Sequence, residues 1–120
     1  MKVAVLGASP KPDRYANKAV RLLKQYGHEV TPINPSHDVI ESLPVVKSLD
    51  ETLPGSFHTV TVYLGADRST ALADALLAAR PGRVIFNPGA ENPALAERLR
   101  AAGIATEEAC TLVLLNTGAF

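Results

Sequence analysis

Residues 3–35 read VAVLGASPKPDRYANKAVRLLKQYGHEVTPINP and contain one complete strand–helix–strand unit. Val3–Leu6 is a continuous apolar run closed by Gly7, which is typical of a strand buried on both faces of a parallel sheet. A helix that Gly27 ends is predicted next, because apolar residues recur at spacings of three and four. These residues are Ala16, Ala19, Val20, Leu23 and Tyr26. His28–Asn34 is then predicted to be a second strand, so the unit has the βαβ order of nucleotide-binding folds.

The alternation of strand and helix continues through the rest of the chain. Further strands are predicted at Thr59–Leu64, Arg83–Phe86 and Ile104–Thr106. Between them we expect one helix with Asp67 as its N-cap and another that begins at Asn92–Pro93 and ends at Gly103. Residues 36–57 are the least regular part. Cys110–Leu115 is apolar, but its periodicity does not distinguish helix from strand.

These patterns predict a Rossmann-like fold with three α/β/α layers around a mainly parallel sheet of about five strands. A chain of 120 residues is expected to form a single domain, residues 1–120. Ligands of such sheets bind beyond the carboxyl ends of the strands, where the strand order reverses. The segments at those ends are 7–14, 34–37, 64–68 and 87–92, so we expect the functional residues there.

The composition excludes several classes of protein. Basic and acidic residues balance to a formal net charge of +0, so no nucleic-acid or membrane surface is expected. No apolar run approaches the ~18 residues of a transmembrane helix. A single cysteine forms no internal disulfide. Together these properties predict a cytoplasmic protein.

The loop after the first predicted strand has the composition of a phosphate site. Gly7, Ala8 and Ser9 are small, so backbone N–H groups can approach a phosphate at the start of the following helix. The Ser9 hydroxyl is an additional donor, and Lys11 and Arg14 add positive charge. These groups predict binding of a diphosphate, although a tight turn between a strand and a helix has the same local pattern.

The loop departs from the dinucleotide fingerprint Gly-x-Gly-x-x-Gly. Of the three glycine positions, only Gly7 is glycine, and the others hold Ser9 and Pro12. Asn34 stands where an acidic residue would bind the ribose hydroxyls of NAD. The sequence therefore disfavours ordinary NAD binding.

The stretch quoted above resembles the CoA-binding domain family, small relatives of the CoA-binding domain in the α subunit of succinyl-CoA synthetase. Members open with an apolar strand, Gly-Ala-Ser, a loop with proline, lysine and arginine, a helix ending in glycine, and a strand ending in Asn-Pro. The matching residues here are Gly7–Ser9, Lys11, Pro12, Arg14, Gly27–His28 and Asn34–Pro35. The rest of the chain, including Thr59–Leu64 and Cys110, matches more weakly.

The resemblance implies a ligand, coenzyme A or acyl-CoA, and its placement. The diphosphate is expected near Ser9, Lys11 and Arg14, the adenosine end near Asn34, Pro35 and Tyr63, and the pantetheine arm along Asn87–Gly89. The full predicted binding set is Gly7, Ala8, Ser9, Lys11, Arg14, Asn34, Pro35, Ser36, Tyr63, Asn87, Pro88 and Gly89.

The chain departs from the family at two positions. Many relatives have a lysine directly after Asn-Pro and a basic residue after the aromatic residue of the fourth strand. Here Ser36 and Leu64 occupy these positions, and each change removes a cationic partner of a phosphate.

No catalytic or metal-binding residue is expected. His28, His37 and His58 are scattered, and Cys110 beside an apolar run is expected in the core. The sequence therefore predicts a binding module for CoA or acyl-CoA that lacks catalysis of its own. Two alternatives stay open: an enzyme of the Rossmann class (an NAD-dependent oxidoreductase or a component of an acyl-CoA transferase or ligase), and an interaction protein whose pocket has decayed. The apolar Cys110–Leu115 segment also allows a homo-oligomer.

Overall fold

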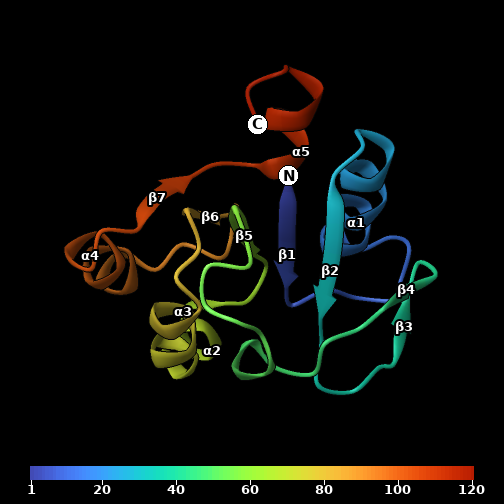
Figure 1. Ribbon diagram of the computed structural model, residues 1–120. Helices are drawn as coiled ribbons and strands as arrows, with labels where there is room; N and C mark the ends of the chain where they lie inside the picture. Colours follow the sequence, from blue (N-terminus) through green and yellow to red (C-terminus); the bar gives the residue numbers. More distant parts are fainter.

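The apolar run after Lys2 forms an inner strand of a five-stranded parallel sheet (Figure 1). The computed structural model describes all of residues 1–120. The strand order is β2-β1-β5-β6-β7. The strands are β1 (Lys2–Leu6), β2 (Glu29–Ile33), β5 (Thr59–Val62), β6 (Arg83–Phe86) and β7 (Ala105–Glu108). The predicted Rossmann-like α/β fold is therefore confirmed.

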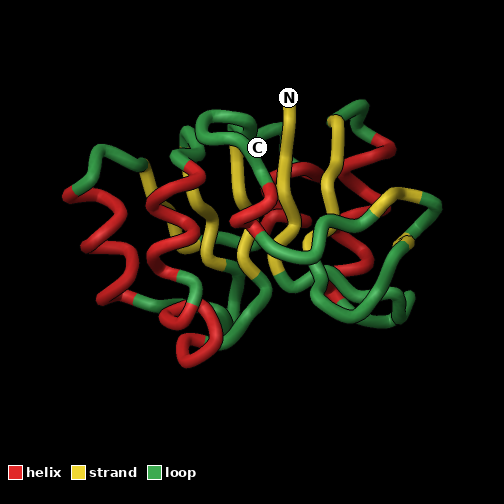
Figure 2. Tube along the Cα trace, turned by 60° about the horizontal axis from the view of Figure 1, so that its bottom comes forward, coloured by secondary structure: helices red, strands yellow, loops and turns green.

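Helices cover both faces of this sheet (Figure 2). They are α1 (Tyr15–Gln25), α2 (Ala66–Ala71), α3 (Ala73–Ala79), α4 (Pro93–Ala101) and α5 (Thr111–Asn116). Because successive strand residues point to opposite faces, Ala4 and Leu6 pack in one core cluster with residues of α3 and α4. Val3 and Val5 pack in the other, with residues of α1 and α5. The sheet is thus the middle of three layers.

The irregular segment between β2 and β5 forms a small attachment beside the sheet. It contains a hairpin of β3 (Val39–Ile40) and β4 (Leu43–Pro44), followed by the short 3-10 helix η1 (Leu49–Glu51). Val46 pairs with Ile33 as an isolated parallel bridge. This segment therefore extends from the carboxyl end of β2 and returns to it.

Two predicted boundaries were wrong, and one ambiguity is resolved. The helix predicted from Asp67 begins after Gly65 and divides at Leu72 into α2 and α3. The side chains of Ser69 and Asn92 both donate hydrogen bonds to the Ala66 carbonyl oxygen, at 3.2 Å each, so they compete for a carbonyl of the first turn.

The last strand extends to Glu108, two residues beyond the predicted end, and the apolar segment after Cys110 is helix α5.

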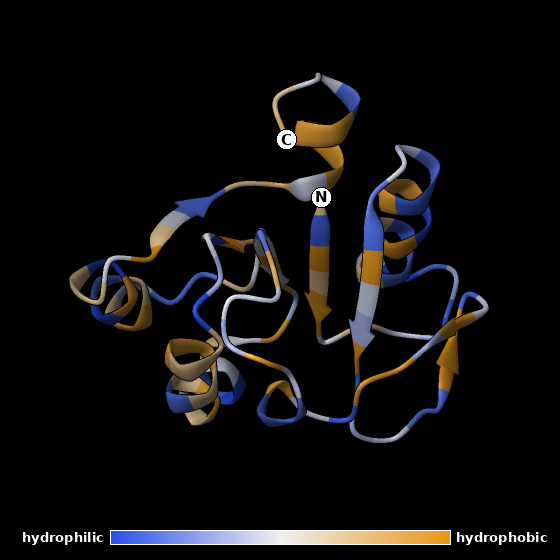
Figure 3. Cartoon of the chain, in the orientation of Figure 1, coloured by the Kyte–Doolittle hydropathy of each residue, from blue (hydrophilic) through white to orange (hydrophobic).

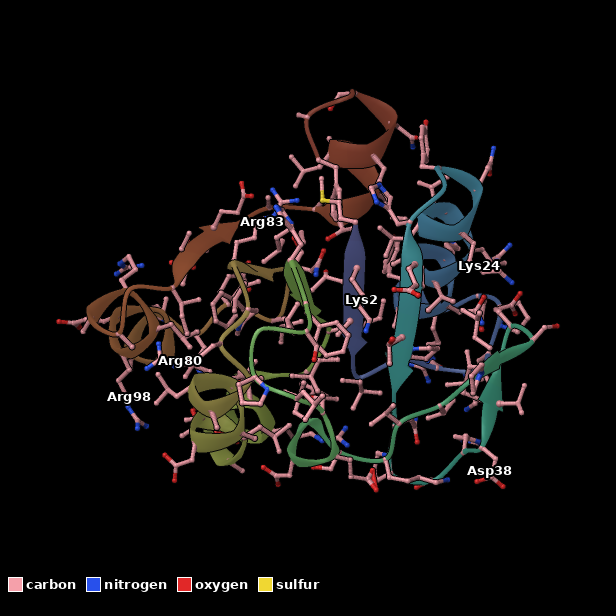
Figure 4. All side chains as sticks on the ribbon, in the orientation of Figure 1. Lys2, Lys24, Asp38, Arg80, Arg83 and Arg98 are labelled. Atoms are coloured by element: carbon pink, nitrogen blue, oxygen red, sulfur yellow. The ribbon has the colours of Figure 1, made fainter.

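Hydropathy distinguishes the inner strand β1 from the edge strand β7 (Figure 3). β1 is hydrophobic after its first residue, whereas β7, at one edge, is polar. Polar side chains at an edge discourage pairing with another chain. Arg83, labelled in Figure 4, donates a hydrogen bond to Glu107 across β6 and β7 at 3.0 Å.

No helix combines the length and apolar character needed to cross a membrane.

The turn after β1 depends on Gly7, and Gly7→Ala is expected to destabilise the protein. Gly7 has φ +87, and a Cβ atom there would lie 2.8 Å from Leu64 Cδ2. We expect a loss of about 1–2 kcal/mol from the left-handed backbone and about 1–3 kcal/mol from overpacking. Urea unfolding measures the change. Gly103→Ala is the matched control, because Gly103 has φ +85 with nothing within 4 Å of its Cβ position. Equal losses in the two variants would show that the contact with Leu64 is unimportant.

Candidate ligand site

The strand order reverses at β1, because the chain passes to β2 on one side and returns to β5 on the other. This is the position at which open parallel sheets bind ligands. Two cavities of about 580 Å³ each lie here, one on either side of the loop Gly7–Ser9, and both Gly7 and Ser9 line each of them. The loop is therefore a ridge between two neighbouring cavities.

The first cavity contains most of the predicted binding residues. Its lining comes from the loop and the start of α1, from the ends of β5 and β6, and from the approach to α5. Besides Gly7 and Ser9, it is lined by Lys11, Arg14, Tyr15, Ala16, Tyr63, Asn87, Pro88, Gly89, Ala90, Cys110 and Leu112.

The second cavity lies between the end of β2, the segment before η1, and α2. Besides the ridge residues Gly7, Ala8 and Ser9, it is lined by Leu6, Ile33, Asn34, Pro35, Lys47, Ser48, Leu49, Leu64, Arg68, Ala71 and Leu72. Its walls are largely apolar, and its only ionisable side chains are Lys47 and Arg68.

The structure separates Tyr63 from Asn34 and Pro35, although the resemblance implied that all three lie near the adenosine. Tyr63 lines the first cavity, whereas Asn34 and Pro35 line the second. The reason is the alternation of side chains along a strand: Tyr63 points to one face and Leu64 to the other. Leu64, which replaces a basic residue of the family, packs in the core against the Gly7 position.

The ridge holds its shape through hydrogen bonds to β2. The amides of Gly7 and Ala8 both donate to the Ile33 carbonyl oxygen, at 3.3 and 3.2 Å. Of the three amides expected to face a phosphate, these two are therefore already paired, and the Ser9 amide has no partner within the protein. The Ser9 hydroxyl accepts from the Lys11 amide at 3.2 Å, so its proton is available to donate.

The first turn of α1 adds further unpaired donors to the first cavity. The amides of residues 15–17 have no acceptor within the protein, and no side chain caps the helix at Arg14. Residues 14–16 line the first cavity. Unpaired amides at a helix start attract anions, so the cavity wall combines these amides with the charges of Lys11 and Arg14.

Asn34 supports the ridge with its side chain. Its Nδ2 donates to the Ala8 carbonyl oxygen at 2.8 Å, and its Oδ1 accepts from the Ser36 amide at 2.7 Å. An asparagine is required for this pair of bonds, because a carboxylate has no donor for the Ala8 carbonyl. Ser36, although predicted as a binding residue, lines neither cavity.

Asn87 supports the opposite wall in the same way. Its buried side chain donates to Thr61 Oγ1 at 2.7 Å and accepts from the Thr111 amide at 2.9 Å. The hydroxyls of Thr61 and Thr111 lie 2.8 Å apart. This network connects the ends of β5 and β6 to the start of α5 and sets the backbone of Pro88 and Gly89 along the first cavity.

Tyr63 and Cys110 lie on the wall of the first cavity. Burial, and after it the proximity of Cys110, raise the pKa of the Tyr63 phenol well above its ordinary value. The hydroxyl is buried without a hydrogen-bond partner. Cys110 is only partly buried and lines the cavity, so the expectation that it belongs to the core was wrong. It precedes the short helix α5, whose buried residues are Thr111 and Leu115.

Sequence patterns did not identify Asn17, which connects the ridge to α1 and to the β3–β4 hairpin. It is fully buried, and its Nδ2 donates to the Ser9 carbonyl oxygen at 2.9 Å and to Glu41 Oε2 at 3.1 Å. Its Oδ1 accepts from Arg21 Nε at 2.8 Å. Glu41 itself has φ 49 in the hairpin turn. An asparagine on the inner side of a helix was the one available signal of this role.

Comparisons with known proteins show the family of the chain. The model of the CoA binding domain family matches residues 1–116. The uncharacterized protein YneT of Bacillus subtilis (strain 168) is 29% identical over 76 residues, 63% of this chain and 56% of YneT, so the match spans little more than half of that relative.

Solved structures share the fold. The crystal structure of an uncharacterized protein is 35% identical, with a TM-score of 0.92 over 99% of this chain and 97% of that chain. The dinucleotide forming acetyl-coenzyme A synthetase 1 of Ca. Korarchaeum cryptofilum, in complex with phosphate and ADP, is 22% identical, with a TM-score of 0.74. There, 88% of this chain matches 25% of the synthetase chain, which is a similarity of fold alone.

Asn17→Ala is expected to destabilise the protein by about 1–3 kcal/mol, because it removes a buried side chain that makes three hydrogen bonds. Urea unfolding measures this change. Gln25→Ala, at the exposed end of the same helix, is the control and should change stability by less than about 0.5 kcal/mol. An Asn17→Ala variant as stable as the wild type would contradict the role of this side chain.

Tyr63 is expected to reduce stability at alkaline pH. Because its pKa is raised in the folded state, its contribution is complete below the unfolded value of about 10 and is lost as pH rises beyond it. Unfolding free energies measured across this range should fall less steeply in Tyr63→Phe than in the wild type. Tyr15→Phe is the matched control at an exposed position. Identical slopes for the wild type and Tyr63→Phe would contradict the raised pKa.

Proposed function

The chain belongs to the CoA-binding domain family, and from this premise we propose that it binds coenzyme A or acyl-CoA across the ridge Gly7–Ser9. The observation that carries the proposal is the pair of cavities that share this ridge. CoA has a diphosphate between two chemically different arms, and two cavities joined at a phosphate loop complement that arrangement. Each cavity, at about 580 Å³, has the size of an ordinary ligand pocket.

The lining of each cavity suggests which arm it accepts. The second cavity has apolar walls from Leu49, Leu64 and Leu72, against which a flat adenine ring can pack. The first cavity extends along Pro88 and Gly89 towards Cys110 and offers a path to the pantetheine arm. We therefore assign the adenosine to the second cavity and pantetheine to the first.

The diphosphate is assigned to the ridge and the adjoining helix start. The donors there are the Ser9 amide and hydroxyl, the unpaired amides of Tyr15 and Ala16, and the charged ends of Lys11 and Arg14. Hydrogen bonds from charged or oriented donors to phosphate are among the stronger polar contacts. The amides of Gly7 and Ala8 contribute indirectly, by fixing the ridge on β2.

The same residues support a binding module in preference to an enzyme. No histidine, aspartate or glutamate lines either cavity. The Tyr63 phenol, with its raised pKa, is unsuited to act as a base near neutral pH. NAD binding would need an acidic residue at position 34 to bind the ribose hydroxyls. Asn34 stands there, and its side chain already makes hydrogen bonds with Ala8 and Ser36.

Ser9→Ala and Lys11→Ala are each expected to weaken CoA binding about tenfold or more, because each removes a donor to a charged phosphate. Isothermal titration calorimetry with CoA measures the affinities. Lys18→Ala is the matched control, since Lys18 is an exposed lysine of α1 that lines neither cavity. Lys11→Ala should also flatten the salt dependence of binding.

Equal affinity in the wild type and both variants would place the ligand elsewhere, and absence of binding at millimolar CoA would refute the proposal. The oxidoreductase alternative is tested by mixing the protein with NADH and measuring the change in NADH fluorescence. A change with NADH that CoA does not reverse would favour that alternative.

A further inference from the structure

The second cavity carries positive charge that the diphosphate does not use. Lys47 enters it from the segment before η1, and Arg68 enters it from α2. No acidic residue lines this cavity. Two cations from separate segments therefore line a cavity that has no acidic side chain to neutralise them.

Both side chains are able to accept a phosphate. Arg68 is exposed, and its guanidinium has no hydrogen-bond or ion-pair partner in the protein. Lys47 Nζ lies 2.7 Å from Asp38 Oδ1 and donates to the His37 carbonyl oxygen at 2.7 Å. Figure 4 shows Asp38 at the outer edge of the molecule, beside β3. An ion pair with such an exposed carboxylate is weak, so a phosphate can compete for the ammonium.

Without a ligand, the Asp38 carboxylate is the ionic partner of Lys47. The hydrogen bond from Lys47, together with its charge, holds the pKa of the Asp38 carboxyl below its ordinary value. The Asp38 carboxylate is consequently ionised near neutral pH. Lys47 is thus held by two contacts at the rim of the cavity.

The chemistry of CoA supplies a matching anion. CoA has a phosphate on the 3′ oxygen of its ribose in addition to the diphosphate. With the diphosphate at Ser9, Lys11 and Arg14, this third phosphate accompanies the adenosine into the second cavity. Its cations do not come from positions 36 and 64, which hold Ser36 and Leu64. Lys47 and Arg68 are the only cations that line the cavity in their place.

We propose that Lys47 and Arg68 bind the 3′-phosphate of CoA and make the site select CoA over 3′-dephospho-CoA. This inference rests on the proposed function and on the assignment of adenosine to the second cavity. Two basic side chains that approach one phosphate from different elements discriminate by charge as well as by position. The chain thereby recovers, from other elements, the cations absent at positions 36 and 64.

Calorimetry with CoA and 3′-dephospho-CoA tests the proposal on the wild type, Lys47→Ala, Arg68→Ala and the double variant. The wild type should bind CoA at least about tenfold more tightly than dephospho-CoA. Each single variant should lose about tenfold in CoA affinity while its affinity for dephospho-CoA stays within about twofold. The double variant should bind both ligands equally. Lys18→Ala, which changes the same charge outside the cavities, should keep the wild-type ratio.

Asp38→Asn keeps both cations and is expected to increase the preference for CoA, whereas the lysine and arginine variants reduce it. It eliminates the carboxylate that competes for Lys47, so the preference for CoA should increase several-fold. The salt dependence of CoA binding should be steeper for the wild type than for the double variant.

The outcomes separate this inference from the proposed function. Tight binding of both ligands with equal affinity in the wild type would overturn the role of Lys47 and Arg68 and leave CoA binding intact. An unchanged ratio in the double variant would do the same. Failure of both ligands to bind the wild type would overturn the proposed function and this inference with it.

Discussion

The contact between Gly7 and Leu64 is the constraint on which the rest of the site depends. Only a residue without a side chain allows β1 to turn at φ +87 while Leu64 packs against the turn. The same turn directs the amides of Gly7 and Ala8 to the Ile33 carbonyl oxygen at the end of β2. The carboxyl ends of β2, β1 and β5 are therefore held around one loop, and the two cavities lie on its two sides.

Three asparagine side chains are the internal supports of this arrangement. Asn34 ties β2 to the ridge, Asn87 ties β5 and β6 to α5, and Asn17 ties the ridge to α1 and the hairpin. Each is buried or partly buried with its amide in hydrogen bonds, as buried polar groups require. The groups left for a ligand are backbone donors, one hydroxyl and mobile cations.

The distribution of cations gives the site its electrostatic character. Lys11 and Arg14 lie on the first-cavity side of the ridge, and Lys47 and Arg68 line the second cavity. A protein with a net charge of +0 therefore concentrates positive charge where an anionic ligand would bind. These four side chains come from three segments far apart in the chain, so their charges add only in the folded state.

The sequence by itself determined the parallel α/β fold and the loop at its switch point. Apolar runs such as Val3–Leu6, the helical spacing up to Gly27 and the Asn92–Pro93 helix start are local patterns, and local propensity is enough to define them. Tertiary structure decided which side chains share a cavity. Tyr63 and Leu64 are neighbours in sequence but point to opposite faces of the sheet just beyond β5. Lys47 and Arg68 line the same cavity although 20 residues separate them in the chain. Such proximity arises from strand order and packing, which no local pattern contains.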